Sequence, residues 1–200
     1  MRVALAERLC CPQGHAGTPL VVRADAVQDG QLVDGIAGCP SCRTEWTLRA
    51  DRIVFGPTAP LPATPSPSAD ALMALLGLAD PEALVWCDGV DADAAAALLA
   101  LARPELVLAD APVRVVGALH IDGAATVPFA AGSFAAAALF RSARDLPWLA
   151  SVVRALRPGG RLVADAAIAV PPGVRELARV EALWVGEREA GGAPITLRRA

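Results

Sequence analysis

Apolar residues along positions 70–200 gather in short blocks of two alternating kinds. Compact apolar runs such as 83–87 and 105–109 are typical of buried strands. Segment 91–102 instead has acidic residues in its first turn, strong helix formers after them and a proline just beyond its end, which is the pattern of a helix. This alternation predicts a parallel sheet that helices cover on both faces.

The same pattern assigns the remaining elements of this segment. The predicted helices are 70–78, 91–102, 146–156 and 174–179. The predicted strands are 83–87, 105–109, 113–121, 134–140 and 161–165, followed by a hairpin of 182–189 and 194–199. We therefore predict the α/β class, with a Rossmann-like, mostly parallel sheet that ends in a C-terminal antiparallel hairpin.

Proline interrupts the pattern between residues 57 and 69. Repeated proline fixes φ and removes backbone donors, so this stretch can join neither a helix interior nor a central strand and favours extended polyproline II. It predicts a linker between a small N-terminal module, residues 1–56, and the α/β domain, residues 70–200.

Composition supports a folded chain, because 54% of the residues are hydrophobic and 20% are charged. We find no apolar run long enough to span a bilayer and no apolar N-terminal secretion signal, so we expect a soluble, cytoplasmic protein with reduced thiols. The net charge of −3 gives no overall attraction to nucleic acid. The expected partner is therefore another protein or a second copy of the chain.

Two Cys-Pro turns, which begin at Cys11 and Cys39, dominate the N-terminal module. In a metal-binding turn of this kind, amides two and three residues beyond the first cysteine point at its sulfur, so a proline directly after it costs no hydrogen bond. Three thiolates and one imidazole form a closed tetrahedral set, which is typical of structural Zn²⁺. The candidate ligands are Cys11, His15, Cys39 and Cys42.

Alternatives remain for these cysteines. Cys10 could replace either Cys11 or His15 as a ligand, and the thiols could instead be small buried hydrophobes or a redox pair. Cys87 lies within the first predicted strand and is expected in the core.

Residues 8–55 carry further features of one family. A leucine precedes the first Cys-Pro turn, Gly17 and Pro19-Leu20 follow it, and a second Cys-Pro-x-Cys leads into the aromatic and aliphatic tail 46–55. This pattern resembles the Trm112-like zinc ribbons, whose members act as small partners or appendages of methyltransferases. The sequence departs from the family in having His15 in place of a cysteine.

Two segments of the larger domain carry a second resemblance. Residues 126–134 read T-V-P-F-A-A-G-S-F, and residues 154–162 read R-A-L-R-P-G-G-R-L. Both are similar to segments of the class I methyltransferases that depend on S-adenosylmethionine. The resemblance implies a donor site at Asp88 and Gly89 after the first strand, with Asp110 on the ribose hydroxyls.

The donor turn itself departs from that family. Where the family has acidic-x-Gly-x-Gly-x-Gly, residues 88–93 read D-G-V-D-A-D, with one glycine. Branched Val90 would crowd the loop, and Asp91 and Asp93 add negative charge but suit the first turn of a helix. Gly123 stands where the resemblance places the acid that recognises adenine. The sequence therefore argues against S-adenosylmethionine binding and predicts a degenerate site.

No residue is assigned a catalytic role. His120 could act as a general base by its ordinary pKa, but its apolar strand favours a packed side chain. A set of arginines could form an anion-binding face or lie solvated on helices: Arg141, Arg144, Arg154, Arg157 and Arg161.

Three functions stay open from the sequence. The first is a non-catalytic scaffold built from a structural zinc ribbon and a decayed methyltransferase-like domain, including a role as partner of another methyltransferase. The second is an active methyltransferase with an atypical cofactor loop, which leaves the enzyme question open. The third is RNA binding by the ribbon through Trp46 and four arginines, namely Arg23, Arg43, Arg49 and Arg52.

Overall fold

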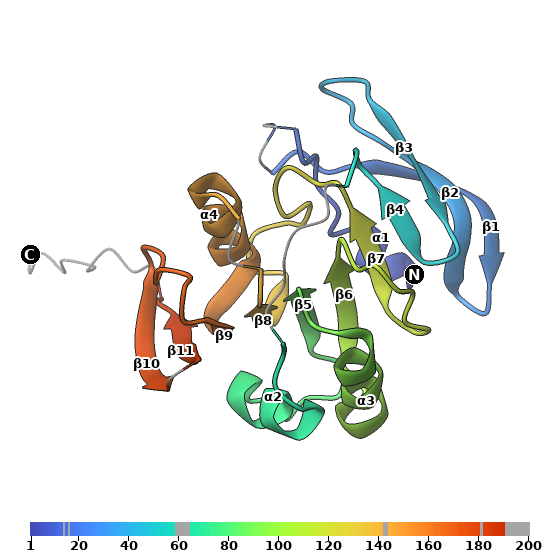
Figure 1. Cartoon of the computed structure of the whole chain (residues 1–200). Coiled ribbons are helices and arrows are strands. Elements are labelled where there is room, and N and C mark those ends of the chain that lie inside the picture. The colour runs from blue at the N-terminus through green and yellow to red at the C-terminus, as the bar shows by residue number, and fades with distance from the viewer. Residues whose placement is uncertain (14, 16, 59–64, 142–143, 181, 191–200) are drawn as a thin grey trace, which may run out of the picture.

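The computed structural model describes residues 1–13, 15, 17–58, 65–141, 144–180 and 182–190. Within these residues the strands form a single 11-stranded sheet in the order β1-β2-β3-β4-β7-β6-β5-β8-β9-β11-β10. Figure 1 shows this sheet running from the N-terminal strands at the upper right to the C-terminal hairpin at the lower left.

The N-terminal segment contributes one short helix and an antiparallel half-sheet. Its elements are α1 (Val3–Ala6), β1 (Val21–Gln28), β2 (Gln31–Gly38), β3 (Glu45–Arg49) and β4 (Arg52–Val54). Trp46, Leu48 and Ile53 point into the core, whereas Glu45, Thr47 and Arg49 are exposed. This alternation leaves one face of the half-sheet in contact with solvent.

The α/β segment places five parallel strands in the order β7-β6-β5-β8-β9. Their bounds are β5 (Leu84–Asp88), β6 (Glu105–Ala109), β7 (Leu119–Asp122), β8 (Phe134–Leu139) and β9 (Leu156–Asp165). When the five strands are numbered along the chain, their order in the sheet is 3-2-1-4-5, as in a doubly wound sheet. The order of the strands reverses between β5 and β8, although all five strands point the same way. A ligand of such a sheet binds at the carboxyl ends of the strands beside that reversal.

Helices cover both faces of the parallel strands. The helices α2 (Ala69–Leu76) and α3 (Ala92–Ala102) pack on one face, and α4 (Leu146–Ala155) packs on the other. The side chains of Ser68, Asp91 and Asp145 cap these helices by accepting from backbone N–H groups three residues on. The helical role predicted for Asp91 is thus confirmed. Among the described residues, no helix is both long enough and apolar enough to cross a membrane.

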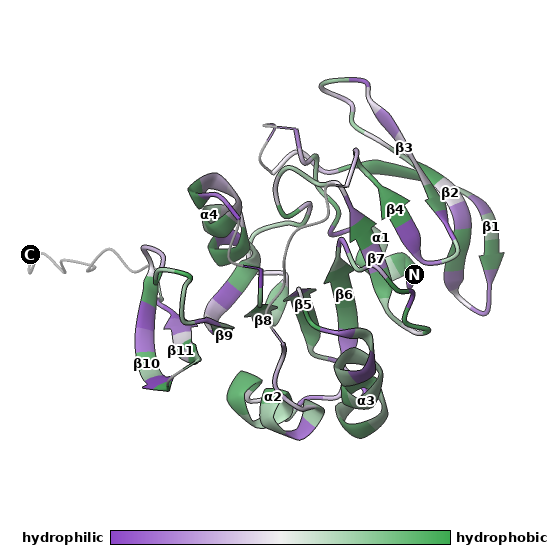
Figure 2. Cartoon of the chain, viewed as in Figure 1, coloured by the Kyte–Doolittle hydropathy of each residue, from purple (hydrophilic) through white to green (hydrophobic). Residues whose placement is uncertain are grey.

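The two segments share a sheet and a core. Strand β4 pairs in parallel with β7, so that Ile53 lies beside Ile121. Leu9 pairs with Phe129 across the junction, and both side chains are fully buried. One hydrophobic cluster contains these residues together with Trp46 of β3. Figure 2 shows green, apolar ribbon running through both parts of the sheet.

The α/β class is confirmed, but the whole sheet is mixed, with antiparallel pairings at both ends of its parallel strands, and some elements differ. Segment 174–179 is not a helix: it belongs to β10 (Val174–Val180), which pairs with β11 (Leu183–Arg188). Cross-strand pairing and burial of Val174 override the local helical pattern. The second arm of the predicted hairpin, 194–199, lies outside the described residues, as do 59–64 of the linker.

Two further boundaries differ. The predicted strand 113–121 is formed only at 119–122, because 113–118 is a loop. Strand β9 starts at Leu156 and contains the Arg-Pro-Gly-Gly segment, where its register against β8 shifts.

The chain passes from β4 directly over the end of β7. Gly123 has a φ of +64°, and a Cβ added there would overlap the Gly56 carbonyl. A glycine is therefore required at this crossing for two reasons, its backbone conformation and the close approach of a second backbone.

We predict that Gly123→Ala destabilises the fold much more than Gly159→Ala. Both glycines have positive φ, +64° and +73°, but Gly159 has nothing within 4 Å of an added Cβ. Gly159→Ala should cost about 1–2 kcal/mol for the left-handed backbone alone. Urea unfolding of both variants measures the difference, and equal losses would contradict the close crossing.

Candidate functional site

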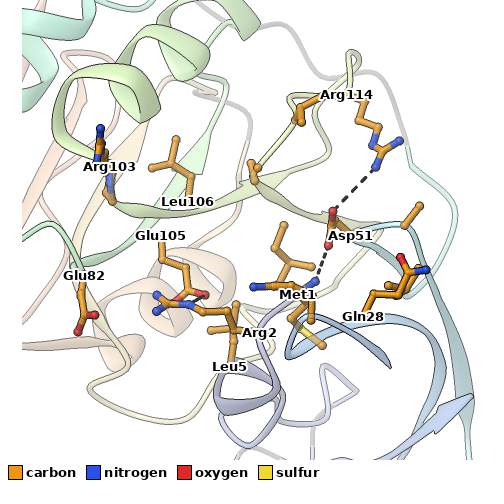
Figure 3. Close-up of a pocket in the computed structure, with 18 of the residues that line it drawn as sticks. Met1, Arg2, Leu5, Gln28, Asp51, Glu82, Arg103, Glu105, Leu106 and Arg114 are labelled. Carbon is orange, nitrogen blue, oxygen red and sulfur yellow. Dashed lines mark hydrogen bonds and ion pairs between the residues drawn. The ribbon is translucent and has the colours of Figure 1, made fainter. Parts of the chain in front are cut away.

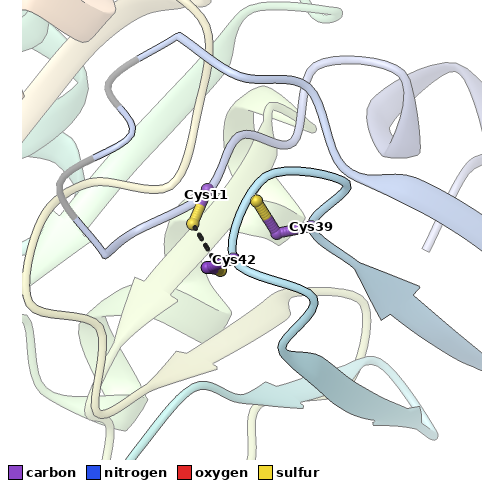
Figure 4. Close-up of side chains that lie close together, drawn as sticks. All are labelled: Cys11, Cys39 and Cys42. Atoms are coloured by element: carbon purple, nitrogen blue, oxygen red, sulfur yellow. Dashed lines mark hydrogen bonds between the residues drawn. The ribbon is translucent and has the colours of Figure 1, made fainter.

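Three cysteines come together beside the N-terminal half-sheet. The Sγ atoms of Cys11, Cys39 and Cys42 all lie within 4.8 Å of one another, and Cys11 Sγ is 3.8 Å from Cys42 Sγ. Figure 4 shows the turn that carries Cys39 and Cys42 facing the loop that carries Cys11. The backbone N–H of Gln13, two residues beyond Cys11, donates to its sulfur at 3.5 Å, as the turn pattern predicts.

This cluster has the chemistry of a soft-metal site. Hydrogen bonds from the Thr44 side chain and backbone lower the pKa of Cys42 to about 6, so that its thiolate is available near neutral pH. Burial raises the pKa of Cys11 to about 11. A bound cation would remove that thiol proton. The three sulfurs fit Zn²⁺, which takes thiolate ligands in tetrahedral geometry.

The remaining candidate ligands lie apart from the cluster. The His15 side chain is exposed and is not among the grouped ligands of the described residues. Cys10 is buried, and its Sγ lies 3.9 Å from the Arg8 carbonyl oxygen. Of the four predicted ligands, the structure therefore brings three together.

The second candidate site lies at the reversal of the sheet. Asp88 ends β5 and is fully buried, and Gly89 follows it with a φ of +79°. Asp110 directly follows β6, and Arg141 follows β8 after Phe140. The predicted residues Asp88, Gly89 and Asp110 thus lie at the carboxyl edge where a doubly wound sheet binds ligands.

Two guanidinium groups occupy this edge. Arg141 Nη1 lies 2.8 Å from Asp88 Oδ1, and Arg144 Nε lies 2.9 Å from Asp88 Oδ2. Arg144 Nη2 also lies 2.6 Å from Asp110 Oδ2, and its guanidinium stands 4.5 Å from the centre of the Trp148 ring. Burial opposes the charge on Arg144, but its bonds to Asp88 and Asp110 raise its pKa above the usual value.

Most polar atoms of these edge residues have partners within the described chain, and among them Arg141 Nε is buried without one. Arg141 donates to the carbonyls of Ala109 and Asp110 at 2.8 and 2.7 Å. The second carboxylate oxygen of Asp110 accepts from the Gly123 N–H at 2.7 Å. Asp122, at the end of β7, is paired with Arg52 at 2.9 Å. Each acid at the carboxyl ends of β5, β6 and β7 is therefore bound by an arginine of the chain.

The residues present do not fit S-adenosylmethionine. A Cβ added at Gly89 would lie 2.9 Å from Arg141 Cγ, so the space beside this single glycine is filled by the arginine. Arg144 and the Gly123 N–H already donate to the two oxygens of Asp110, so ribose hydroxyls would have to share these oxygens with them or displace them. The Gly56 backbone fills the space beside Gly123, where the resemblance places a side chain that recognises adenine.

Two cavities lie at opposite edges of the sheet. One of about 430 Å³ borders Gly89 and is lined mainly by aliphatic side chains of Val90, Leu108, Val113 and Val115. The other, of about 740 Å³, lies where the N-terminus meets the start of β6, and Figure 3 shows its side chains. Arg2 and Glu105 pair within it, at 2.9 and 2.7 Å. This amino edge is not where doubly wound sheets bind ligands.

His120 does not take part in either site. It is fully buried in β7, where its Nε2 accepts from the Val115 N–H at 3.1 Å. Burial lowers its pKa, so the ring is neutral at neutral pH. The packed histidine favoured by the sequence is what the structure shows.

Sequence reasoning missed the roles of Arg141 and Arg144, which it placed on an anion-binding face or on solvated helices. Arg154, Arg157 and Arg161 do not join them: Arg154 donates to the Phe129 and Val127 carbonyls, and Arg157 is exposed. One signal in the sequence could have indicated this pairing. Asp88 and Asp110 stand at the ends of β5 and β6, and the strand order places the end of β8, which leads to Arg141, beside them.

Comparisons with protein-family models and with curated protein sequences give no match. Solved structures do match. The 1,6-didemethyltoxoflavin-N1-methyltransferase of Burkholderia thailandensis, with bound S-adenosylhomocysteine, is 13% identical over 61% of this chain and 76% of that chain, with a TM-score of 0.43. A TehB-like methyltransferase from Corynebacterium glutamicum is 16% identical over 62% and 89%, with a TM-score of 0.43. The antibiotic-resistance methyltransferase Kmr is 16% identical over 64% and 96%, with a TM-score of 0.41.

We predict that Arg141→Ala lowers the free energy of unfolding by about 1–3 kcal/mol, because the buried Asp88 carboxylate keeps Arg144 but loses one of its charged hydrogen-bond donors. Adding Asp88→Asn should recover part of this loss. The control is Arg179→Ala, which removes an exposed pair with Glu176 and should leave the unfolding midpoint unchanged. Equal effects of the two alanine variants in urea unfolding would contradict the role given to Arg141.

Proposed function

We propose that this chain is a non-catalytic binding protein, in which a structural zinc ribbon is fused to a methyltransferase-like domain that no longer takes a methyl donor. The proposal rests on one observation: Arg141 and Arg144 fill the carboxyl edge and hold Asp88 and Asp110. Its partner is a protein, and the reduced thiols of the cysteine cluster suit the cytoplasm.

Magnitudes support this view. A donor that binds with a micromolar Kd gains about 8 kcal/mol in total. Separating a buried carboxylate from its cation costs about 3–5 kcal/mol. A donor that had to displace Arg144 from Asp88 and Asp110 would therefore bind only in the millimolar range.

The alternative is an active methyltransferase with an atypical cofactor loop. The observation in its favour is the aliphatic cavity of about 430 Å³ that borders Gly89 and Val90. In this alternative Arg144 would leave Asp110 when the donor enters.

The zinc part of the proposal uses Cys11, Cys39 and Cys42, with His15 as the fourth ligand and Cys10 as its alternative. A closed shell of four ligands would make the metal structural, with no position for substrate. The first cysteine turn, which begins at Cys11, contacts the α/β segment through a hydrogen bond: Thr126 Oγ1 donates to the Pro12 carbonyl at 3.1 Å. Metal binding would thus stabilise the junction between the two segments.

Donor binding tests the non-catalytic proposal. We expect calorimetric titration with S-adenosylmethionine or S-adenosylhomocysteine to give no Kd tighter than the millimolar range, since the carboxylates are already paired. A Kd in the micromolar range that Asp110→Asn abolishes would overturn the proposal and favour the active enzyme.

Metal analysis tests the zinc site. Protein purified without chelator should hold about one zinc per chain, and Cys39→Ser should lower this ratio and the unfolding midpoint. Cys87→Ala is the control, because Cys87 is buried in β5 away from the cluster. Cobalt substitution of His15→Ala and Cys10→Ser identifies the fourth ligand from the thiolate charge-transfer intensity. A wild-type ratio well below one would contradict the site.

A further inference from the structure

The half-sheet β1–β4 has one face that no helix of the described chain covers. Its inner face enters the shared core through Trp46, Leu48 and Ile53. Its outer face carries exposed side chains from each of the four strands, and two of them are aliphatic: Val21 is 66% exposed and Val54 is 49% exposed. We call this surface, defined by Val21, Arg23, Asp25, Asp34, Ile36, Glu45, Thr47, Arg49, Arg52 and Val54, the outer face.

The outer face is hollowed along its width. Three shallow hollows of about 320, 540 and 590 Å³ follow one another from β1 to β4. Ile36 and Thr47, which lie beside each other on β2 and β3, occupy the middle of the surface. A central pair of low polarity with charged residues around it is the usual anatomy of a protein interface.

Charge is divided across the outer face. Strand register places Asp34 beside Arg49 and Arg49 beside Arg52, so one row of the sheet runs from acidic on β2 to basic on β3 and β4. Asp25, on β1, lines the same hollow as Asp34 and extends the acidic side. Within the described residues, neither Asp34 nor Arg49 has an ion-pair partner.

A two-fold axis parallel to the strands, between β2 and β3, makes this surface complementary to itself. Such an axis places β2 of one copy over β3 of the other and keeps each row in register, so Asp34 faces Arg49 of the second copy. In the same row β1 lies over β4, which brings Asp25 towards Arg52 of the second copy. Within each copy Asp25 is already paired with Arg23 and Arg52 with Asp122, so the Asp34–Arg49 contact carries the complementarity. Aligned sheets pack face to face in this way, and an isologous contact closes as a dimer.

We infer that the outer face binds the outer face of a second copy of this chain. This inference deepens the proposed function, because it names the partner of the binding protein. The four strands are roughly 20 Å across at about 4.8 Å per strand. A contact of this size lies at the small end of protein interfaces, so the dimer should be weak and dependent on concentration.

The outer face carries three of the four arginines that the sequence offered for RNA, namely Arg23, Arg49 and Arg52, and Arg43 lies beside it in the turn between β2 and β3. The structure favours a protein partner over RNA for two reasons. Trp46, the expected stacking residue, is only 6% exposed and donates its Nε1–H to the Phe55 carbonyl. Asp25, Asp34 and Glu45 lie among the arginines and would repel phosphates.

Sedimentation of the zinc-loaded full chain, from about 10 μM to about 1 mM, tests the inference over the range of weak complexes. We expect a monomer–dimer equilibrium, a shift of at least tenfold towards monomer in both Asp34→Arg and Arg49→Asp, and recovery in the double variant Asp34→Arg/Arg49→Asp. Arg157→Asp, an exposed arginine on β9, is the matched control and should behave as wild type. Circular dichroism and metal content confirm that each variant is folded.

Each contrary result has a clear meaning. A wild-type chain that stays monomeric throughout, a dimer that Arg49→Asp leaves intact, or a double variant that stays monomeric while folded overturns the inference. Fluorescence anisotropy with a labelled single-stranded RNA tests whether the outer face binds RNA instead. RNA binding that Asp34→Arg strengthens and Arg49→Asp removes would also overturn the dimer inference. None of these results bears on donor binding, so the non-catalytic proposal stands or falls separately.

Discussion

A fully buried carboxylate, Asp88, constrains the carboxyl edge of this sheet. An ionised acid in such a place must be paired, since an uncompensated charge there is strongly destabilising. The chain meets this requirement with Arg141 and Arg144, and Arg144 also binds Asp110. The ends of β5, β6 and β8 are thereby tied to one another at the edge where doubly wound folds bind ligands.

The N-terminal segment is integrated into the same body. The pairing of β4 with β7 continues the sheet, and the shared hydrophobic cluster continues the core. The cysteine cluster lies beside this junction, where Thr126 of the α/β segment contacts the first cysteine turn. The cysteine cluster and the junction are thus close in space, although they come from distant parts of the sequence.

Local sequence patterns predicted much of the fold but little of the arrangement of side chains at the candidate sites. Strand 105–109 and helix α3 with its Asp91 cap follow from apolar runs and helix-start signals, which act over a few residues. Strand β10 could not be found this way, because its pairing with β11 decides its state. The same holds for the pairing of Arg144 with Asp88, which depends on strand order, and for the Gly56–Gly123 crossing, which depends on where the linker passes.

The parallel pairing of β4 with β7 also limits which strand edges the N-terminal segment can offer to other molecules. A short tether keeps two joined modules at an effective concentration in the millimolar range. A foreign strand would have to compete with that concentration, and with the buried contacts behind it, to take the edge of β4. The N-terminal segment is covalently linked to the strand with which it pairs, so it occupies that edge with one-to-one stoichiometry.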